Sequence, residues 1–321
     1  MKILVLIGCT VWLITATVAQ TGPLKEKPGP ASKQAVINAK TARDKLPENT
    51  LLWEISGKGL QKASYLFGTM HLLCAEDTKL SDNLKNIIKE AKLIYFEIDL
   101  DNLVEMMGAL KYVRMNDNKK LSDILSEEEF KKVSNYFEKN PTILPLNIME
   151  SFKPYFISSL ISEQKMTCEN KGGMEQAIMG EAKQFRKEIK GLETVQFQAS
   201  VFDSIPYQQQ AKELVKYIDS MGTNTQVIEE LVSVYKQQNL EKIEELTNKE
   251  EGGVAEFIDL LLYNRNADWV NKMQGIMQSD GVLFAVGAAH LPGEKGVINL
   301  LRQKGFTVKP LPNVMQAGVE L

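Results

Sequence analysis

The stretch "YLFGTMHLL", Tyr65–Leu73, is repeated in outline near the other end of the chain by "LFAVGAAHLPG", Leu283–Gly293. Each is an apolar run typical of a buried β-strand, followed by glycine, two residues, histidine and leucine. The chain has only two histidines, His71 and His290, and both occupy this position. We therefore expect two strands of one sheet, each ending in a turn that presents an imidazole.

Strand and helix signals alternate around both stretches. Residues 51–71 hold two apolar runs around the glycine turn "GKG" and predict a hairpin. Ser81 is a good N-cap for a helix that ends before "KLIYFEIDL", residues 92–100, and this strand–helix–strand order suggests a parallel pairing. Residues 281–310 again read strand, helix and strand, while the middle of the chain is mostly helical. The pattern predicts one α/β domain with a helical insertion.

Carboxylates follow two other predicted strands in the same way as the histidines. "LIYFEID" supplies Glu97 and Asp99, and "EIKGLET" supplies Glu193. Asp99 is placed to cap the next helix, which leaves Glu97 as the better ligand candidate. Ligands of open α/β sheets bind at the carboxyl ends of strands, so His71 and His290 are expected to share a site with these carboxylates.

Two neutral imidazoles with one or two carboxylates are a suitable ligand set for a divalent metal ion. A metal-bound water is a nucleophile near neutral pH, so the set suggests hydrolysis. The residues leave a second interpretation open, in which both histidines end sheet turns without binding metal.

The N-terminal segment differs from the rest of the chain. Residues 1–19 begin with a basic residue, continue with an apolar stretch and end in small residues, which predicts a secretory signal peptide cleaved after Ala19. An uncleaved anchor and a lipoprotein signal at "LIGC", Leu6–Cys9, remain alternatives. Residues 20–50 are polar and proline-rich, a leader before a domain spanning residues 51–321. The protein is thus expected to be exported, periplasmic or secreted, with a lipoprotein tether as the alternative.

Removal of the signal peptide leaves two of the three cysteines, Cys74 and Cys168. In an oxidising compartment these form a disulfide or remain two separately buried thiols, and the sequence does not decide between them. Cys74 lies three residues after His71, so it is either a fourth metal ligand or a buried packing residue.

Composition limits the choice of partner. The chain is 44% hydrophobic and 25% charged with a formal net charge of −3, so it has no electrostatic footprint for nucleic acid. Neither a GxxxxGK[ST] nor a GxGxxG phosphate loop occurs. No stretch after the signal peptide is long and apolar enough for a membrane helix, so we expect no span in the mature chain.

Several segments together resemble the TraB/GumN (PrgY) superfamily, which includes the Tiki metalloproteases. They are "LLWEISGKGLQKASYLFGTMHL", "YFEID", "GGMEQAIMGEAKQFRKEIKGLETVQFQ", "LLYNRNADWV" and "FAVGAAHLPGEKGVINLLRQKGFTVKPL". The resemblance runs from about Leu51 to Leu311 and is weak around residues 101–170. It implies an erythromycin-esterase/ChaN-like fold, with a central mixed sheet from two related halves flanked by helices.

The resemblance also implies a metal-dependent hydrolase site. His71, His290 and Glu97 match the functional residues of the Tiki branch and are the implied metal ligands. Glu193 matches a further carboxylate position, and Arg265 in "NRN" matches the basic position, where it binds a substrate carboxylate or oxyanion or forms a structural ion pair. Glu97, Glu193 and Arg265 are therefore the candidate catalytic residues. The implied metal is manganese or cobalt, with zinc as a further candidate.

The function we expect from the sequence is an exported metal-dependent peptidase acting on a peptide or protein through metal-activated water. Which of Glu97 and Glu193 is ligand and which is general base stays open. The alternative is a non-catalytic protein on the same fold that binds peptide or haem or acts in regulation, because fold alone does not determine activity.

Overall fold

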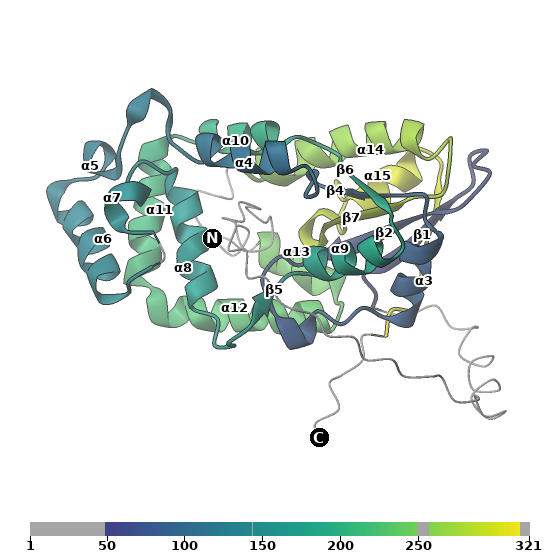
Figure 1. The fold of residues 1–321 in the computed structure, drawn as a ribbon, viewed down its shortest axis with the longest axis horizontal. Coiled ribbons are helices and arrows are strands. Elements are labelled where there is room, and N and C mark those ends of the chain that lie inside the picture. The colour runs from purple at the N-terminus through teal and green to yellow at the C-terminus, as the bar shows by residue number, and fades with distance from the viewer. Residues whose placement is uncertain (1–48, 143, 249–256, 315–321) are drawn as a thin grey trace, which may run out of the picture.

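Figure 1 shows the computed structural model of the chain, which describes residues 49–142, 144–248 and 257–314. The predicted signal peptide at residues 1–19 and nearly all of the predicted leader at residues 20–50 lie outside the described residues. Within the described ranges, no helix combines the length and apolar character that a membrane crossing needs.

A mixed sheet of six strands forms the centre of the fold, as the sequence predicted. In spatial order its strands are β6 (Glu188–Gly191), β4 (Leu93–Phe96), β7 (Leu283–Gly287), β2 (Ser64–Thr69), β1 (Leu52–Ser56) and β8 (Thr307–Pro310). The first four are mutually parallel, whereas β1 is antiparallel to both β2 and β8. The predicted hairpin of β1 and β2 is confirmed. A separate two-stranded sheet pairs β3 (Leu73–Cys74) with β5 (Lys171–Gly172).

The order of strands corrects one expectation. The unit β2, α3 (Asp82–Glu90) and β4 was expected to pair its two strands, but β7 lies between them. All five residues of β7 are buried, and a strand that is apolar on both faces belongs in the middle of a sheet. β2 and β7 are direct neighbours, with Thr69 opposite Gly287, so the two histidine motifs leave adjacent strands.

Helices cover both faces of the sheet. Phe67 and Ala285 point into one core cluster, which α3 and α9 (Met174–Gln184) complete. Leu66 and Phe284 alternate with them and point into the other cluster, completed by α14 (Asn264–Ile276) and α15 (Val297–Gln303). This alternation is the two-residue period of a strand buried on both sides.

The helical insertion lies mainly to one side of the sheet, at the left of Figure 1. Its helices are α4 (Leu103–Tyr112), α5 (Leu121–Ile124), α6 (Glu127–Lys139), α7 (Leu146–Met149), α8 (Pro154–Gln164), α10 (Val195–Asp203), α11 (Tyr207–Asp219), α12 (Met221–Lys236) and α13 (Leu240–Asn248). Short helical turns lie at η1 (Ala75–Asp77), η2 (Asn116–Asn118), η4 (Asp259–Tyr263) and η5 (Ala288–His290).

Two helices in this block begin at residues suited to a helix start. Ser126 caps α6 in a capping box: its hydroxyl accepts from the Glu129 amide, and the Glu129 carboxylate accepts from the Ser126 amide. Pro154 occupies the first turn of α8, where its missing amide proton costs nothing.

Candidate functional site

The four parallel strands end at the same edge of the sheet, and each is followed by a residue that the sequence analysis singled out. His71 follows β2, Glu97 follows β4, Glu193 follows β6, and His290 ends η5 after β7. Arg265 comes from the first turn of α14. The structure therefore brings the predicted residues to one end of the sheet.

Arg265 joins both carboxylates. Its Nη2 donates to Glu97 Oε2 at 2.7 Å and to Glu193 Oε1 at 2.6 Å, and its Nε donates to both oxygens of Glu193 at 3.1 and 3.2 Å. Its Nη1 donates to the Leu261 carbonyl at 2.8 Å, which ties α14 back to η4. The three charged side chains are almost completely buried, so Arg265 holds two carboxylates together away from water.

Other donors complete the shell of the carboxylates. Gly287 N donates to Glu97 Oε1 at 2.8 Å, and Trp269 Nε1 donates to Glu193 Oε2 at 2.9 Å. The Gln198 amide donates to Glu97 Oε2 at 3.0 Å and Glu193 Oε1 at 3.2 Å. Both Glu193 oxygens are thereby held by Arg265, while Glu97 Oε1 is held by one backbone amide.

The pKa values of Arg265 and Glu193 are shifted by burial and by the neighbouring charges. Burial by itself lowers the pKa of Arg265, but Glu193 and Glu97 raise it, so the guanidinium stays charged. Burial raises the pKa of Glu193 above its usual value, although Arg265 opposes that shift. A second positive charge near this cluster would therefore meet two carboxylates and only one guanidinium.

The tautomer of His290 is determined by Asn266. The Asn266 amide nitrogen donates to the carbonyls of His290 and Lys295, so its Oδ1 faces His290 Nδ1 at 2.6 Å. Nδ1 must then carry the proton, which leaves a lone pair on Nε2. Burial, Arg265 and His71 lower the pKa of His290 well below its usual value, so the imidazole is neutral.

The Nε2 lone pair of His290 points towards the charged cluster. It lies 3.4 Å from Arg265 Nη1 and 3.8 Å from Glu97 Oε1. The ring of Trp269 packs beside the imidazole, with 4.4 Å between the ring centroids. His290 is completely buried, so its orientation is determined on every side by packing and by Asn266.

We predict that this tautomer is visible in solution. The chain has two imidazoles in all, so a ¹H–¹⁵N correlation spectrum of its side-chain histidine nitrogens should show two sets of signals. The His290 set should have the pattern of a neutral ring protonated at Nδ1, and Asn266→Ala should change that pattern while leaving the His71 set in place. A wild-type His290 protonated at Nε2 would contradict the assignment.

His71 has a different partner. Its Nδ1 lies 2.8 Å from Glu175 Oε1, in the first turn of α9. Burial by itself lowers the pKa of His71, but Glu175 reverses the direction and raises it. Between His71 and the cluster of Glu97, Glu193, Arg265 and His290, the described residues contain no hydrogen bond or ion pair. The charges of Glu97 and Arg265 nevertheless influence its pKa, so His71 lies near the cluster.

Asn266, Gln198 and Trp269 are site residues that the sequence analysis did not identify. Asn266 and Trp269 lie in the stretch "NRNADWV" beside Arg265, so their spacing on α14 was a usable signal. Gln198 had none, because its contact depends on how α10 packs against the strand ends. Glu175 belongs to the segment "GGMEQA", whose sequence carries no separate signal for a contact with His71.

The donor atoms suit a divalent metal only in part. No group of three His, Cys, Asp or Glu side chains within the described ranges is arranged to hold a metal ion. Two ring nitrogens have the chemistry to bind a metal ion. His290 Nε2 carries a lone pair, which faces Arg265 Nη1 at 3.4 Å, and His71 Nε2 is buried without a hydrogen-bond partner in the described part of the chain. With Glu97 Oε1 close to His290, the predicted ligand types are present but not gathered into a finished group.

Cys74 and Cys168 form a disulfide, which decides between the alternatives left by the sequence. The alternative of two separately buried thiols is therefore wrong. A bonded sulfur is not a thiolate, so Cys74 is not a fourth metal ligand.

A cavity of about 540 Å³ opens beside the loop that carries Glu193. Its other walls include Glu105, Phe197, Asp268 and Lys272. This volume is within the range of about 300–1,000 Å³ typical of ligand pockets. Among the candidate site residues, Glu193 lines this cavity, whereas His71, Glu97, Arg265 and His290 do not.

The fold and the cluster define a class of protein: a mixed α/β domain with a buried set of histidine, carboxylate and arginine side chains at the carboxyl ends of parallel strands. A sequence profile of the TraB/PrgY/gumN family matches residues 51–310, and the chain belongs to this family. The family predicted from the sequence is thus confirmed.

The chain is similar to curated proteins whose names begin with Metalloprotease TIKI. The human protein named Metalloprotease TIKI1 is 19% identical over 319 residues, covering 82% of this chain and 62% of the human protein. The Metalloprotease TIKI homolog of Amphimedon queenslandica is 22% identical, covering 82% and 62%, and Metalloprotease TIKI1 of Danio rerio is 22% identical, covering 82% and 63%. The chain therefore spans less than two thirds of the length of these relatives. No solved structure matches the chain at a significant level.

Proposed function

We propose that the chain is a metal-dependent hydrolase that cleaves a peptide or protein at the carboxyl end of its sheet. The names of the relatives support a metal-dependent, peptidase-like activity. The observation that carries the proposal is the pair of imidazoles that follow adjacent strands, each held from behind through Nδ1. His71 Nε2 has no hydrogen-bond partner among the described residues, and His290 Nε2 keeps its lone pair beside Arg265 Nη1. A carboxylate or amide behind an imidazole is the usual support of a metal-binding histidine.

Each residue has a separate role in this proposal. His71, His290 and Glu97 would hold the ion, and a bound divalent metal would supply a water that is nucleophilic near neutral pH. Glu175 and Asn266 orient the two imidazoles. Arg265 would orient Glu97, because its Nη2 donates to Glu97 Oε2, and Glu193 keeps the guanidinium in that position.

Peptide access and cellular location are further parts of the proposal. We expect a peptide to approach the cluster from the cavity that Glu193 lines. The disulfide supports export to an oxidising compartment, periplasmic or extracellular, because such bonds rarely persist in the cytosol. Manganese or cobalt remains the proposed metal, with zinc as a further candidate.

The test combines unfolding with cleavage. Metal-stripped protein should gain thermal stability with Mn²⁺, Co²⁺ or Zn²⁺, since an ion at about 100 times its dissociation constant adds roughly 2.7 kcal/mol. That corresponds to a midpoint rise of several degrees in a domain of this size. The same ion should support cleavage of a peptide library. Both effects should be lost in His71→Ala and in His290→Ala.

Gln184→Ala, an exposed change on α9, is the control and should keep both effects. If both histidine variants cleaved peptide and responded to metal like the wild type, the proposed mechanism would be wrong. If the wild type bound peptide tightly but never cleaved it with any metal, the binding function would replace the enzyme.

A further inference from the structure

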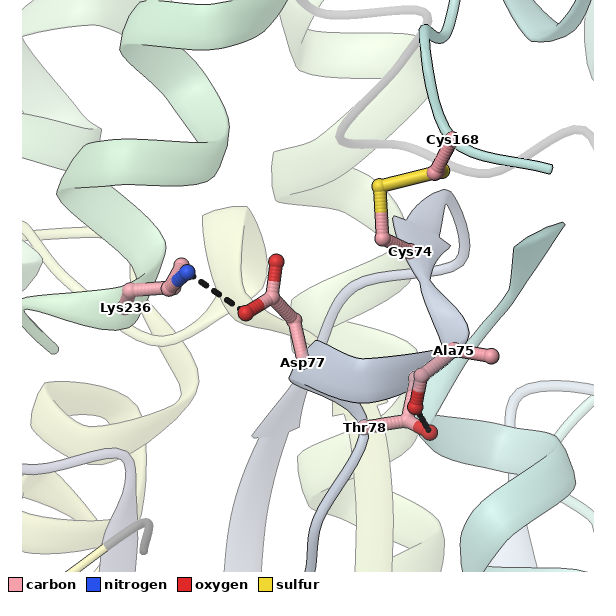
Figure 2. The surroundings of a disulfide bond; sticks show 6 residues. All are labelled: Cys74, Ala75, Asp77, Thr78, Cys168 and Lys236. Carbon is pink, nitrogen blue, oxygen red and sulfur yellow. Dashed lines mark hydrogen bonds and ion pairs between the residues drawn. A yellow bond between two sulfur atoms is a disulfide. The ribbon is translucent and has the colours of Figure 1, made fainter. Parts of the chain in front are cut away.

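The disulfide lies next to the segment that carries His71. Cys74 ends β3, three residues after His71, and Cys168 lies between α8 and β5 (Figure 2). Beside the disulfide the chain segments pair as strands, with Leu73 opposite Gly172 and Cys74 opposite Lys171. The bond thus joins the two segments at the end of a strand pair that is only two residues long.

The same pairing continues as far as the histidine. The Met174 amide donates to the Met70 carbonyl at 3.1 Å. Gly173 passes so close to His71 that an added Cβ would lie 2.5 Å from the His71 carbonyl oxygen, so only glycine fits there. The next turn of chain brings Glu175 to His71 Nδ1 at 2.8 Å. Glu175, the partner of His71, therefore lies on the same chain segment as Cys168, a few residues after it.

Buried packing and hydrogen bonds also hold these two segments: Met70, Leu73 and Met174 share one core cluster. The Ala75 amide donates to the Asn170 carbonyl at 2.9 Å, which joins the residue after Cys74 to the segment that leads into β5. Figure 2 shows the remaining support of η1, the ion pair of Asp77 with Lys236 and the bond from the Thr78 hydroxyl to the Ala75 carbonyl. The Asp77–Lys236 ion pair and the Thr78–Ala75 bond hold η1 in place, but neither includes a residue of the segment that precedes Glu175. A pair of two-residue strands is too short to persist without further support.

We propose that the Cys74–Cys168 disulfide is a positioning element for His71. It holds β3 against β5, so that Gly173 stays packed on the His71 backbone and Glu175 stays within reach of its imidazole. Opening the bond should free the His71–Glu175 pair while the sheet remains folded. The relevance to metal binding rests on the proposed function, but the positioning itself does not.

His290 provides an internal control for this proposal. Its contacts come from Asn266, Trp269 and Arg265 on α14 and from η5, none of which belongs to the segments joined by the disulfide. A local effect of the disulfide must therefore reach His71 and spare His290. A general loss of stability would affect both imidazoles.

The experiment follows the two imidazoles in the full chain labelled with ¹⁵N-histidine, with His71→Ala assigning the signals. A dithiol reductant supplies two electrons and two protons, converting the disulfide to two thiols while the reductant becomes a cyclic disulfide. Complete reduction is checked by counting free thiols. We expect the His71 signals to shift or broaden on reduction and the His290 signals to stay in place. Cys74→Ser with Cys168→Ser should give the reduced spectrum without reductant.

A second readout is metal affinity, followed by the metal-induced rise in unfolding temperature. Loss of an outer support of a metal-binding histidine typically weakens metal affinity by 10–100-fold, and the same loss is expected after reduction. If oxidised protein shows no metal response but His71 moves on reduction, the proposed function is wrong and the positioning role stands. If both imidazole sets stay unchanged after full reduction, or both move to unfolded positions, the positioning role is overturned.

Discussion

Arg265→Ala is expected to destabilise the protein by about 3–5 kcal/mol, the loss typical of breaking a buried ion pair. Glu97 and Glu193 would then face each other almost completely buried, with the Trp269, Gln198 and Gly287 donors but no positive charge. In a domain of this size the loss corresponds to a fall in unfolding midpoint of about 10 °C. Thermal unfolding followed by circular dichroism measures it.

Arg114→Ala is the matched control. Arg114 is exposed and donates to Ser151, so its loss should change the midpoint little. Adding Glu193→Gln to Arg265→Ala should recover part of the stability, because the cost lies in the unpaired carboxylates. An Arg265→Ala midpoint equal to that of the wild type would show that the carboxylates do not depend on the guanidinium.

Much of the fold could be predicted from local sequence patterns. The apolar runs, the glycine turn and the Ser81 cap predicted β1, β2, α3 and β4. The neighbour of β2 could not be predicted in the same way, because pairing between strands far apart in the chain depends on packing of the whole sheet. The uninterrupted apolar run of β7, which is fully buried in the structure, was the local indication that this strand belongs at the centre of the sheet.

The position of the site could be predicted from a topological rule, but the contacts between its side chains could not. Parallel strands deliver their carboxyl ends to one edge, so His71, Glu97, Glu193 and His290 were expected together. The direct partner of each side chain depends on rotamers and on helices that approach from elsewhere. Sequence spacing could not show that His71 pairs with Glu175 while His290 pairs with Asn266.

The structure separates two carboxylates that the sequence could not distinguish. Both oxygens of Glu193 accept from Arg265, and one also accepts from Trp269, so its contacts are those of a residue that positions the guanidinium. Glu97 keeps one oxygen, Oε1, that accepts from Gly287 N and lies 3.8 Å from His290 Nε2. Glu97 is therefore the better placed of the two for the metal-ligand role.

Glu97→Gln and Glu193→Gln are expected to fail in different ways. Glu97→Gln removes an anionic oxygen beside His290, so the metal-induced rise in unfolding temperature should be lost and kcat/KM for peptide cleavage should fall by a factor on the order of 10²–10⁴. Glu193→Gln removes the main anchor of Arg265, so the free energy of unfolding without metal should fall by about 1–3 kcal/mol while most of the metal-induced rise in midpoint remains. Metal titration of unfolding, run on both variants beside the wild type, separates the two roles. The opposite result, with the metal response lost in Glu193→Gln and retained in Glu97→Gln, would make Glu193 the ligand, because a carboxylate that only orients Arg265 has no direct part in holding the ion.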